Sequence, residues 1–113
     1  MINEIKKKLE ELQEVVQIGV CKKVDTWDCL LVRKKRLVKN GTSKMDYSHY
    51  VSIRIIKENE IPEGMEFDVI EKMKEIGYKH AAEPINYEYT IDTNDVVVEI
   101  GELLFVKPRK VCS

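Results

Sequence analysis

The two histidines are the side chains of this sequence best suited to acid–base chemistry. His49 falls on the apolar side of an expected strand, and His80 lies near an expected loop. No serine or cysteine stands in a recognised nucleophile motif. We therefore interpret His49 as a core or interface histidine, and we expect no catalytic residues and no enzymatic activity.

The three cysteines are candidates for metal binding or disulfide formation. Cys21, Cys29 and Cys112 are odd in number and none has Cys-x-x-Cys spacing. Together with the histidines they match no common zinc-ligand pattern. The N-terminus lacks the apolar core of a secretory signal, so we expect folding in a cytosol with reduced thiols and no metal site.

Acidic side chains are plentiful around the middle of the chain, as in Glu58, Glu60 and Glu63. Nothing in their spacing brings two carboxylates together across a cleft, so we interpret this stretch as a solvated loop. Neither a Gly-x-Gly-x-x-Gly motif nor a P-loop is present. We expect no cofactor.

A run of four cations is the strongest charge feature, and it comprises Arg33, Lys34, Lys35 and Arg36. Such a run could contact phosphates, with Trp27 and Tyr50 as stacking surfaces. Successive cations on a strand must point to both faces, so a solvated strand end is the simpler interpretation. The chain has 19 basic and 20 acidic residues, which argues against a dedicated nucleic-acid binder.

Two expected strands position the next feature, a polar loop. Residues 27–38 and 47–56 have the composition and alternation of strands, with Tyr47, Val51, Ile53 and Ile55 on one face. The loop between them is a candidate subunit interface, and it consists of Lys39, Asn40, Gly41, Thr42, Ser43, Lys44, Met45 and Asp46. It has one apolar residue and more turn formers than a tight hairpin needs, so we expect a projecting arm.

The remaining pattern predicts a single α+β domain over residues 1–113. Apolar spacing predicts helices over residues 1–17 and about 65–76. It predicts strands over 85–91, with one half-buried face, and over 96–106, with a bulge or bend at Gly101. Residues 20–24 and 78–82 are weaker strand candidates. The order is α-β-β-α-β-β, and we expect a mostly antiparallel sheet with both helices on one face. No apolar run approaches the ~20 residues of a membrane helix, so we expect no membrane partner.

With these segments in place, the chain resembles the tail-completion proteins, also called tail-terminator or head–tail joining proteins, of siphophages and prophages. The resemblance lies in the N-terminal helix, in Trp27-Asp28-Cys29, in the polar loop leading to Tyr47, in Ile61-Pro62-Glu63-Gly64, and in the closing residues Phe105-Val106-Lys107-Pro108. It covers most of the chain but includes no catalytic motif.

This resemblance implies a non-enzymatic virion structural protein that forms a ring, commonly a hexamer, at the end of the tail tube. Its partners would be further copies of itself, the tail-tube protein and the head connector proteins. Its location would be the virion tail at the head–tail junction, and the bacterial host cytoplasm during assembly. The alternative is a nucleic-acid-binding accessory protein that uses residues 33–36 and the terminal region 107–110. Under the first interpretation we expect only weak, non-specific binding to DNA. A small enzyme is disfavoured because the sequence shows no nucleophile–base or metal-ligand arrangement.

Overall fold

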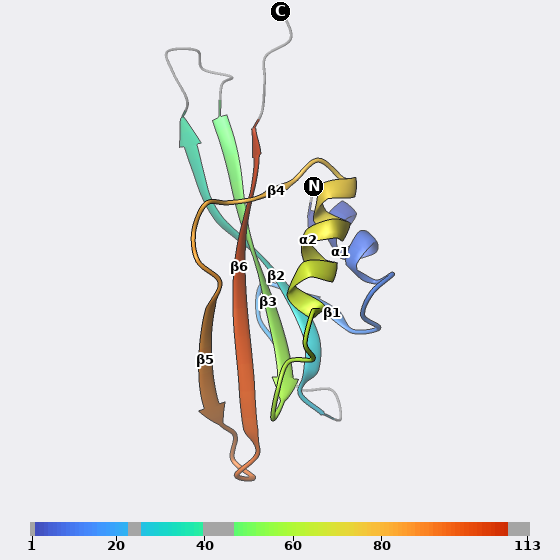
Figure 1. The fold of residues 1–113 in the computed structure, drawn as a ribbon, viewed down its shortest axis with the longest axis vertical. Coiled ribbons are helices and arrows are strands. Elements are labelled where there is room, and N and C mark those ends of the chain that lie inside the picture. The colour runs from blue at the N-terminus through green and yellow to red at the C-terminus, as the bar shows by residue number, and fades with distance from the viewer. Residues whose placement is uncertain (1, 23–25, 40–46, 109–113) are drawn as a thin grey trace, which may run out of the picture.

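Three long antiparallel strands form the body of the protein in the computed structural model, which describes residues 2–22, 26–39 and 47–108 (Figure 1). They are β2 (Asp28–Lys39), β3 (Tyr47–Glu58) and β6 (Val97–Pro108). β3 lies in the middle and pairs with β2 on one side and β6 on the other along nearly its whole length. Its backbone groups are therefore satisfied on both sides.

Shorter strands complete the sheet at its two edges. β1 (Val16–Ile18) pairs in parallel with β2, which makes the sheet mostly rather than wholly antiparallel. β4 (Lys79–His80) and β5 (Asn86–Ile91) both pair with β6, at different points along the edge that β3 does not occupy. The order across the sheet is β1-β2-β3-β6-β4, with β5 beside β6 as well.

Both helices pack on one face of this sheet, as expected from the sequence. They are α1 (Ile2–Leu9) and α2 (Met65–Glu75), and Figure 1 shows them side by side. Between helices and sheet lies the main core, which includes Ile5, Leu9, Leu30, Val32, Val51, Ile53, Ile55, Val69, Met73, Leu103 and Phe105. The α+β class is thus confirmed, and removing these apolar groups from water is the main force that holds the helices on the sheet.

The expected first helix ends earlier than its pattern indicated. It stops at Leu9 instead of continuing to Gln17, and Val16 begins β1. The Leu30 N–H donates to the Val15 carbonyl at 3.0 Å, and the Gly19 N–H donates to the Val32 carbonyl at 2.9 Å. Pairing of this β-branched segment with β2 therefore overrides the helical period. Residues 20–22 are not a strand, and 23–25 lie outside the described residues.

The expected bulge at Gly101 is also wrong. β6 pairs with β3 without a shift through Gly101, opposite Ile55. The glycine is instead explained by close packing, because a Cβ there would lie 2.9 Å from Ile61 Cδ1 and 3.2 Å from Tyr87 Cε1. The sheet does contain a bulge, but it lies in β2 between Lys34 and Arg36.

β5 differs from expectation in its burial. The alternation of Tyr87, Tyr89 and Ile91 predicted a half-buried strand, yet all six residues of β5 are exposed. β5 lies at the sheet edge and contributes no residue to the main core. The tyrosines turn their hydroxyls to carboxylates instead, Tyr87 to Glu66 on α2 and Tyr89 to Glu99 on β6.

We predict that Gly101→Ala destabilises the fold by about 1 kcal/mol, because the added methyl group forces the end of the buried Ile61 side chain to shift. Ile61→Val removes Cδ1, the clashing atom, and is the matched control. Urea unfolding of both single variants and the double variant gives the coupling. The double variant should lose less free energy of unfolding than the sum of the two single losses. Additive losses would contradict the steric explanation.

Candidate functional site

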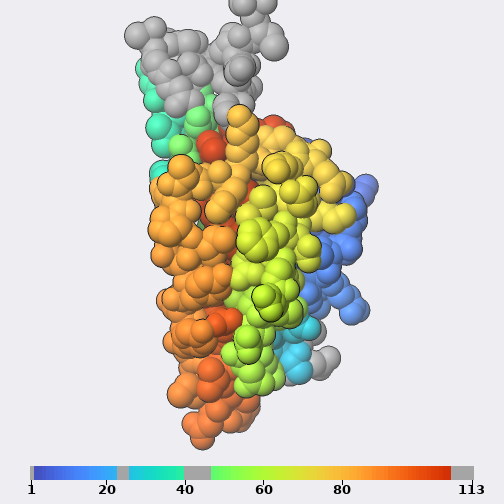
Figure 2. Space-filling model, viewed as in Figure 1, coloured from blue at the N-terminus to red at the C-terminus, as the bar shows by residue number. Residues whose placement is uncertain are grey.

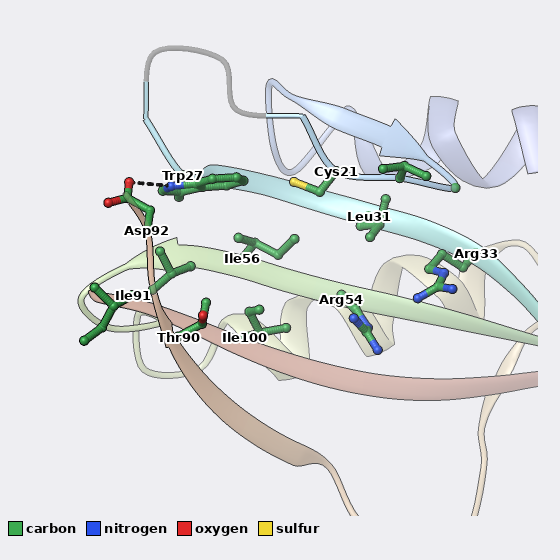
Figure 3. Close-up of a pocket in the computed structure, with 13 residues that line it drawn as sticks. Cys21, Trp27, Leu31, Arg33, Arg54, Ile56, Thr90, Ile91, Asp92 and Ile100 are labelled. Atoms are coloured by element: carbon green, nitrogen blue, oxygen red, sulfur yellow. Dashed lines mark hydrogen bonds between the residues drawn. The ribbon is translucent and has the colours of Figure 1, made fainter. Parts of the chain in front are cut away.

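The face of the sheet without helices carries an apolar groove of about 490 Å³ (Figure 3). We call this face the helix-free face and the cavity the Trp27 groove. Four apolar side chains from the three long strands form its floor, namely Leu31, Ile56, Val98 and Ile100. Gly19, Val20 and Cys21, which follow β1, lie along one side. A concave apolar surface with few polar groups has the general character of a binding site.

One end of the groove is fixed by a tryptophan. The Trp27 indole Nε1 donates to Asp92 Oδ2 at 3.0 Å, as Figure 3 shows. Asp92 Oδ1 accepts the backbone N–H groups of Asn94 at 2.8 Å and Val96 at 3.0 Å. Asp92 therefore holds the β5–β6 turn and ties it to the start of β2, which keeps this end of the groove in place.

Two arginines lie at the other end, and they differ in their partners (Figure 3). Arg54 Nε donates to Glu102 Oε2 at 2.7 Å, and Lys35 Nζ lies 3.9 Å from the same carboxylate. Burial by itself would raise the pKa of Glu102, but the hydrogen bond from Arg54 and the two nearby cations lower it overall. Arg33 is exposed and has no ion pair within the described part of the chain, so its charge can meet an acidic group from outside.

The bulge in β2 changes how the basic run is presented. Lys34 pairs with Val51, and Arg36 pairs with Tyr50, so Lys35 is the extra residue. Arg33, Lys35 and Arg36 consequently share the helix-free face, while Lys34 lies on the other. Arg36 Nη2 lies 3.1 Å from Glu83 Oε1, and its guanidinium carbon lies 4.4 Å from the centre of the Tyr50 ring. The four cations thus form no single open patch, and the Tyr50 ring is covered.

The structure brings two of the cysteines together, which the sequence analysis missed. Cys21 Sγ lies 3.3 Å from Cys29 Sγ beside the groove. The contact depends on β1 returning next to β2, so only the parallel pairing of these strands could have revealed it. Burial, followed by the hydrogen bond with Cys21, raises the pKa of Cys29 to about 12. Cys112 lies outside the described residues.

The histidines are placed apart from any nucleophile. His49 is half-buried in β3 opposite Leu37, and the His80 ring packs on Phe105 with ring centres 5.7 Å apart. Within the described residues, neither imidazole has a hydrogen-bonded hydroxyl or thiol partner. No group of three His, Cys, Asp or Glu side chains in those residues could hold a metal ion.

The acidic residues after β3 are gathered more closely than we expected. Glu60 and Glu63 line a hollow of about 480 Å³ together with Glu66, Glu99, Tyr87 and Tyr89. The expectation that no two carboxylates share a cleft is therefore wrong. Residues of α2, β5 and β6 lie around the loop that carries Glu60 and Glu63. The hydrogen bond with Glu66 raises the pKa of Tyr87 to about 12. The hollow lies on the helix-covered side and forms a negatively charged surface next to α2.

The expected arm lies almost entirely beyond what the structure describes. Lys39 is the exposed last residue of β2, whereas residues 40–46 lie outside the described residues. No helix in the described ranges is long and apolar enough to cross a membrane. No protein-family model matches the sequence, and no curated protein matches it either.

We predict that Arg54→Met destabilises the protein by about 1–3 kcal/mol at pH 7, because it leaves the half-buried Glu102 without its hydrogen-bond donor. Arg33→Met is the matched control on the same face, with an expected change within about 0.5 kcal/mol. Since the folded-state pKa of Glu102 is lowered, the stabilisation is present above its unfolded pKa of about 4.3. It is lost as the pH falls through the folded-state pKa. Urea unfolding at pH 7 and pH 3 measures the free energy of unfolding of both variants. Equal losses of that free energy at pH 7 would contradict the prediction.

We further predict that Cys29 reacts with iodoacetamide much more slowly than Cys21 in the folded protein at pH 8. The raised pKa keeps Cys29 as a neutral thiol, and only 3% of it is exposed. Peptide mass spectrometry after timed alkylation resolves the two sites. In 8 M urea the rates should become similar, and similar rates in the folded protein would show that Cys29 is not protected.

Proposed function

We propose that this chain is a non-enzymatic structural subunit of a phage or prophage tail. In this proposal, copies assemble into a ring that caps the tail tube and joins it to the head connector. The sequence resemblance motivates the proposal, and the exposed surfaces of the fold support it. The protein would act at the head–tail junction of the virion, after assembly in the host cytoplasm.

The outer part of the β2–β3 ribbon is the observation that carries this proposal. Figure 1 shows β2 and β3 continuing past the helices, with β6 beside β3 as far as Pro108, which pairs with Ser48. On β2 this part carries Leu37, which is 56% exposed, and Val38, which is 37% exposed, on opposite sides. Each side of this extension therefore has apolar area that a neighbouring subunit could bury. The ribbon is thus suited to reach across a subunit boundary.

The shape and the free sheet edge also favour assembly. The molecule measures 54 × 24 × 23 Å, and its radius of gyration of 15.2 Å exceeds the ~13 Å typical of a compact chain of this length. Within the described strands, β5 pairs only with β6. Its outer backbone groups and exposed tyrosines are available to a neighbour, and unprotected edge strands readily pair with other chains.

We predict that replacing residues 39–46 with an Asn-Gly turn weakens ring formation but preserves the fold. Loop closure changes slowly with length, and the register of β2 and β3 is fixed by pairs nearer the core. A Gly/Ser segment of eight residues in the same place is the length-matched control. Thermal unfolding and oligomer mass should be measured on the same samples, with electron microscopy of the assemblies.

The outcomes of this experiment separate two explanations. A folded but poorly assembling short-turn variant supports the arm, and a defect in the Gly/Ser variant as well shows that side chains rather than length matter. If the short-turn variant unfolds, the loop is structural. If it forms rings and completes tails normally, the arm plays no part in assembly.

Nucleic-acid binding through residues 33–36 remains the alternative proposal, and the structure offers it less support. Lys35 and Arg36 are both close to carboxylates, which reduces the charge available to phosphates. Only Arg33 and Lys34 of the run lack an ion pair in the described residues. Weak binding that disappears with added salt is the behaviour expected of this surface.

A further inference from the structure

Phe67 is an aromatic side chain that the fold leaves in water. It lies on α2 and is 68% exposed, whereas Met65, Val69 and Met73 of the same helix are buried against the sheet. Figure 2 shows α2 at the surface along its length, next to β5. A phenylalanine on the outer side of a helix contributes little to folding and is available to a partner, so the groups around it decide whether it can serve as a contact.

The surface around Phe67 is acidic. Glu71 lies one helical turn after it, Asp68 is adjacent, and Glu63 lies in the turn just before α2, all three exposed. Glu71 has an ion pair with Lys74 at 3.3 Å, whereas Glu63 and Asp68 have no ion pair among the described residues, so these two carry most of the negative charge. The acidic hollow of Glu60 and Glu66 adjoins this surface. The result is an apolar knob bordered by negative charge.

The Trp27 groove on the opposite face has complementary properties. Its floor is apolar, and Arg33 at one end has no ion pair among the described residues. An aromatic ring would cover Leu31, Ile56 and Ile100, while an acidic neighbour would meet Arg33. Opposite charges placed around an apolar contact fix the orientation of two partners as well as attracting them.

We propose that Phe67 of one copy docks into the Trp27 groove of a second copy of this chain. This inference rests on the proposed ring-forming function and names one of its contacts. The knob lies on the helix-covered face and the groove on the helix-free face, so a single copy can use both at once. Such a contact is heterologous, and repeated around a closed rotation it generates a ring.

The size of the contact also shows what else is required. An aromatic side chain buries about 150–250 Å², whereas a stable interface buries at least about 1,200 Å² in total. Phe67 would therefore act as the central anchor of a larger interface, to which the β2–β3 ribbon contributes.

The test is a complementation experiment with two variants. Phe67→Ala removes the knob but keeps the groove, and Arg33→Glu repels the acidic border but keeps the knob. Each variant alone should assemble at least about tenfold more weakly than the unchanged protein. Mixed at equal concentration, they should form a one-to-one dimer that grows no further, because only one productive contact remains. Oligomer mass is measured by light scattering after size exclusion.

Two further variants serve as controls. Lys7→Glu reverses an exposed charge on α1, outside the knob, the groove and the ribbon, and should assemble normally. Arg33→Ala replaces Arg33→Glu if that variant fails to fold. Unimpaired rings in the single variants, or no dimer in the mixture, would overturn this contact while leaving ring formation intact. A monomeric unchanged protein at every concentration would instead overturn both the contact and the proposed function.

Discussion

The two-sided pairing of β3 is the constraint on which the rest of the structure depends. β3 is bonded to β2 and to β6 along nearly its whole length, so its side chains must serve two different surfaces. Val51, Ile53 and Ile55 meet the helices, whereas Arg54 and Ile56 face the groove. A change in the register of β3 would exchange these sets, and would place the arginine in the main core.

The helix-free face has a small apolar cluster of its own and no helix over it. With both helices on the other side, the described residues cover its apolar strip only at the margins, through those that follow β1 and the turn that Asp92 holds. Trp27 spans part of the strip and has its polar atom satisfied at the edge. The part of the strip that these residues leave open is the Trp27 groove, which is present because both helices pack on the other face of the sheet.

Local pattern was sufficient for much of this fold. The alternation in β3 and β6 and the apolar stripe of α2 gave correct strands and helix, because each has a long, regular period and a buried side. β1 was missed because Val16 also continues the helical stripe of Leu9 and Leu12, and only its pairing with Leu30 decides between helix and strand. The groove and the Cys21–Cys29 contact follow from that same non-local pairing. The exposure of β5 likewise depends on where α2 lies, which its own alternation cannot reveal.

The bulge at Lys35 has a consequence for the ribbon beyond it. One unpaired residue reverses which side of β2 the even-numbered residues occupy, so Leu30 to Lys34 and Arg36 to Val38 follow opposite phases. The inner segment packs against the core, whereas the outer segment is exposed. A substitution in the outer segment therefore changes the exposed surface and leaves the packing under the helices untouched. The strand is continuous in its backbone, but its inner half packs in the protein while its outer half forms exposed surface.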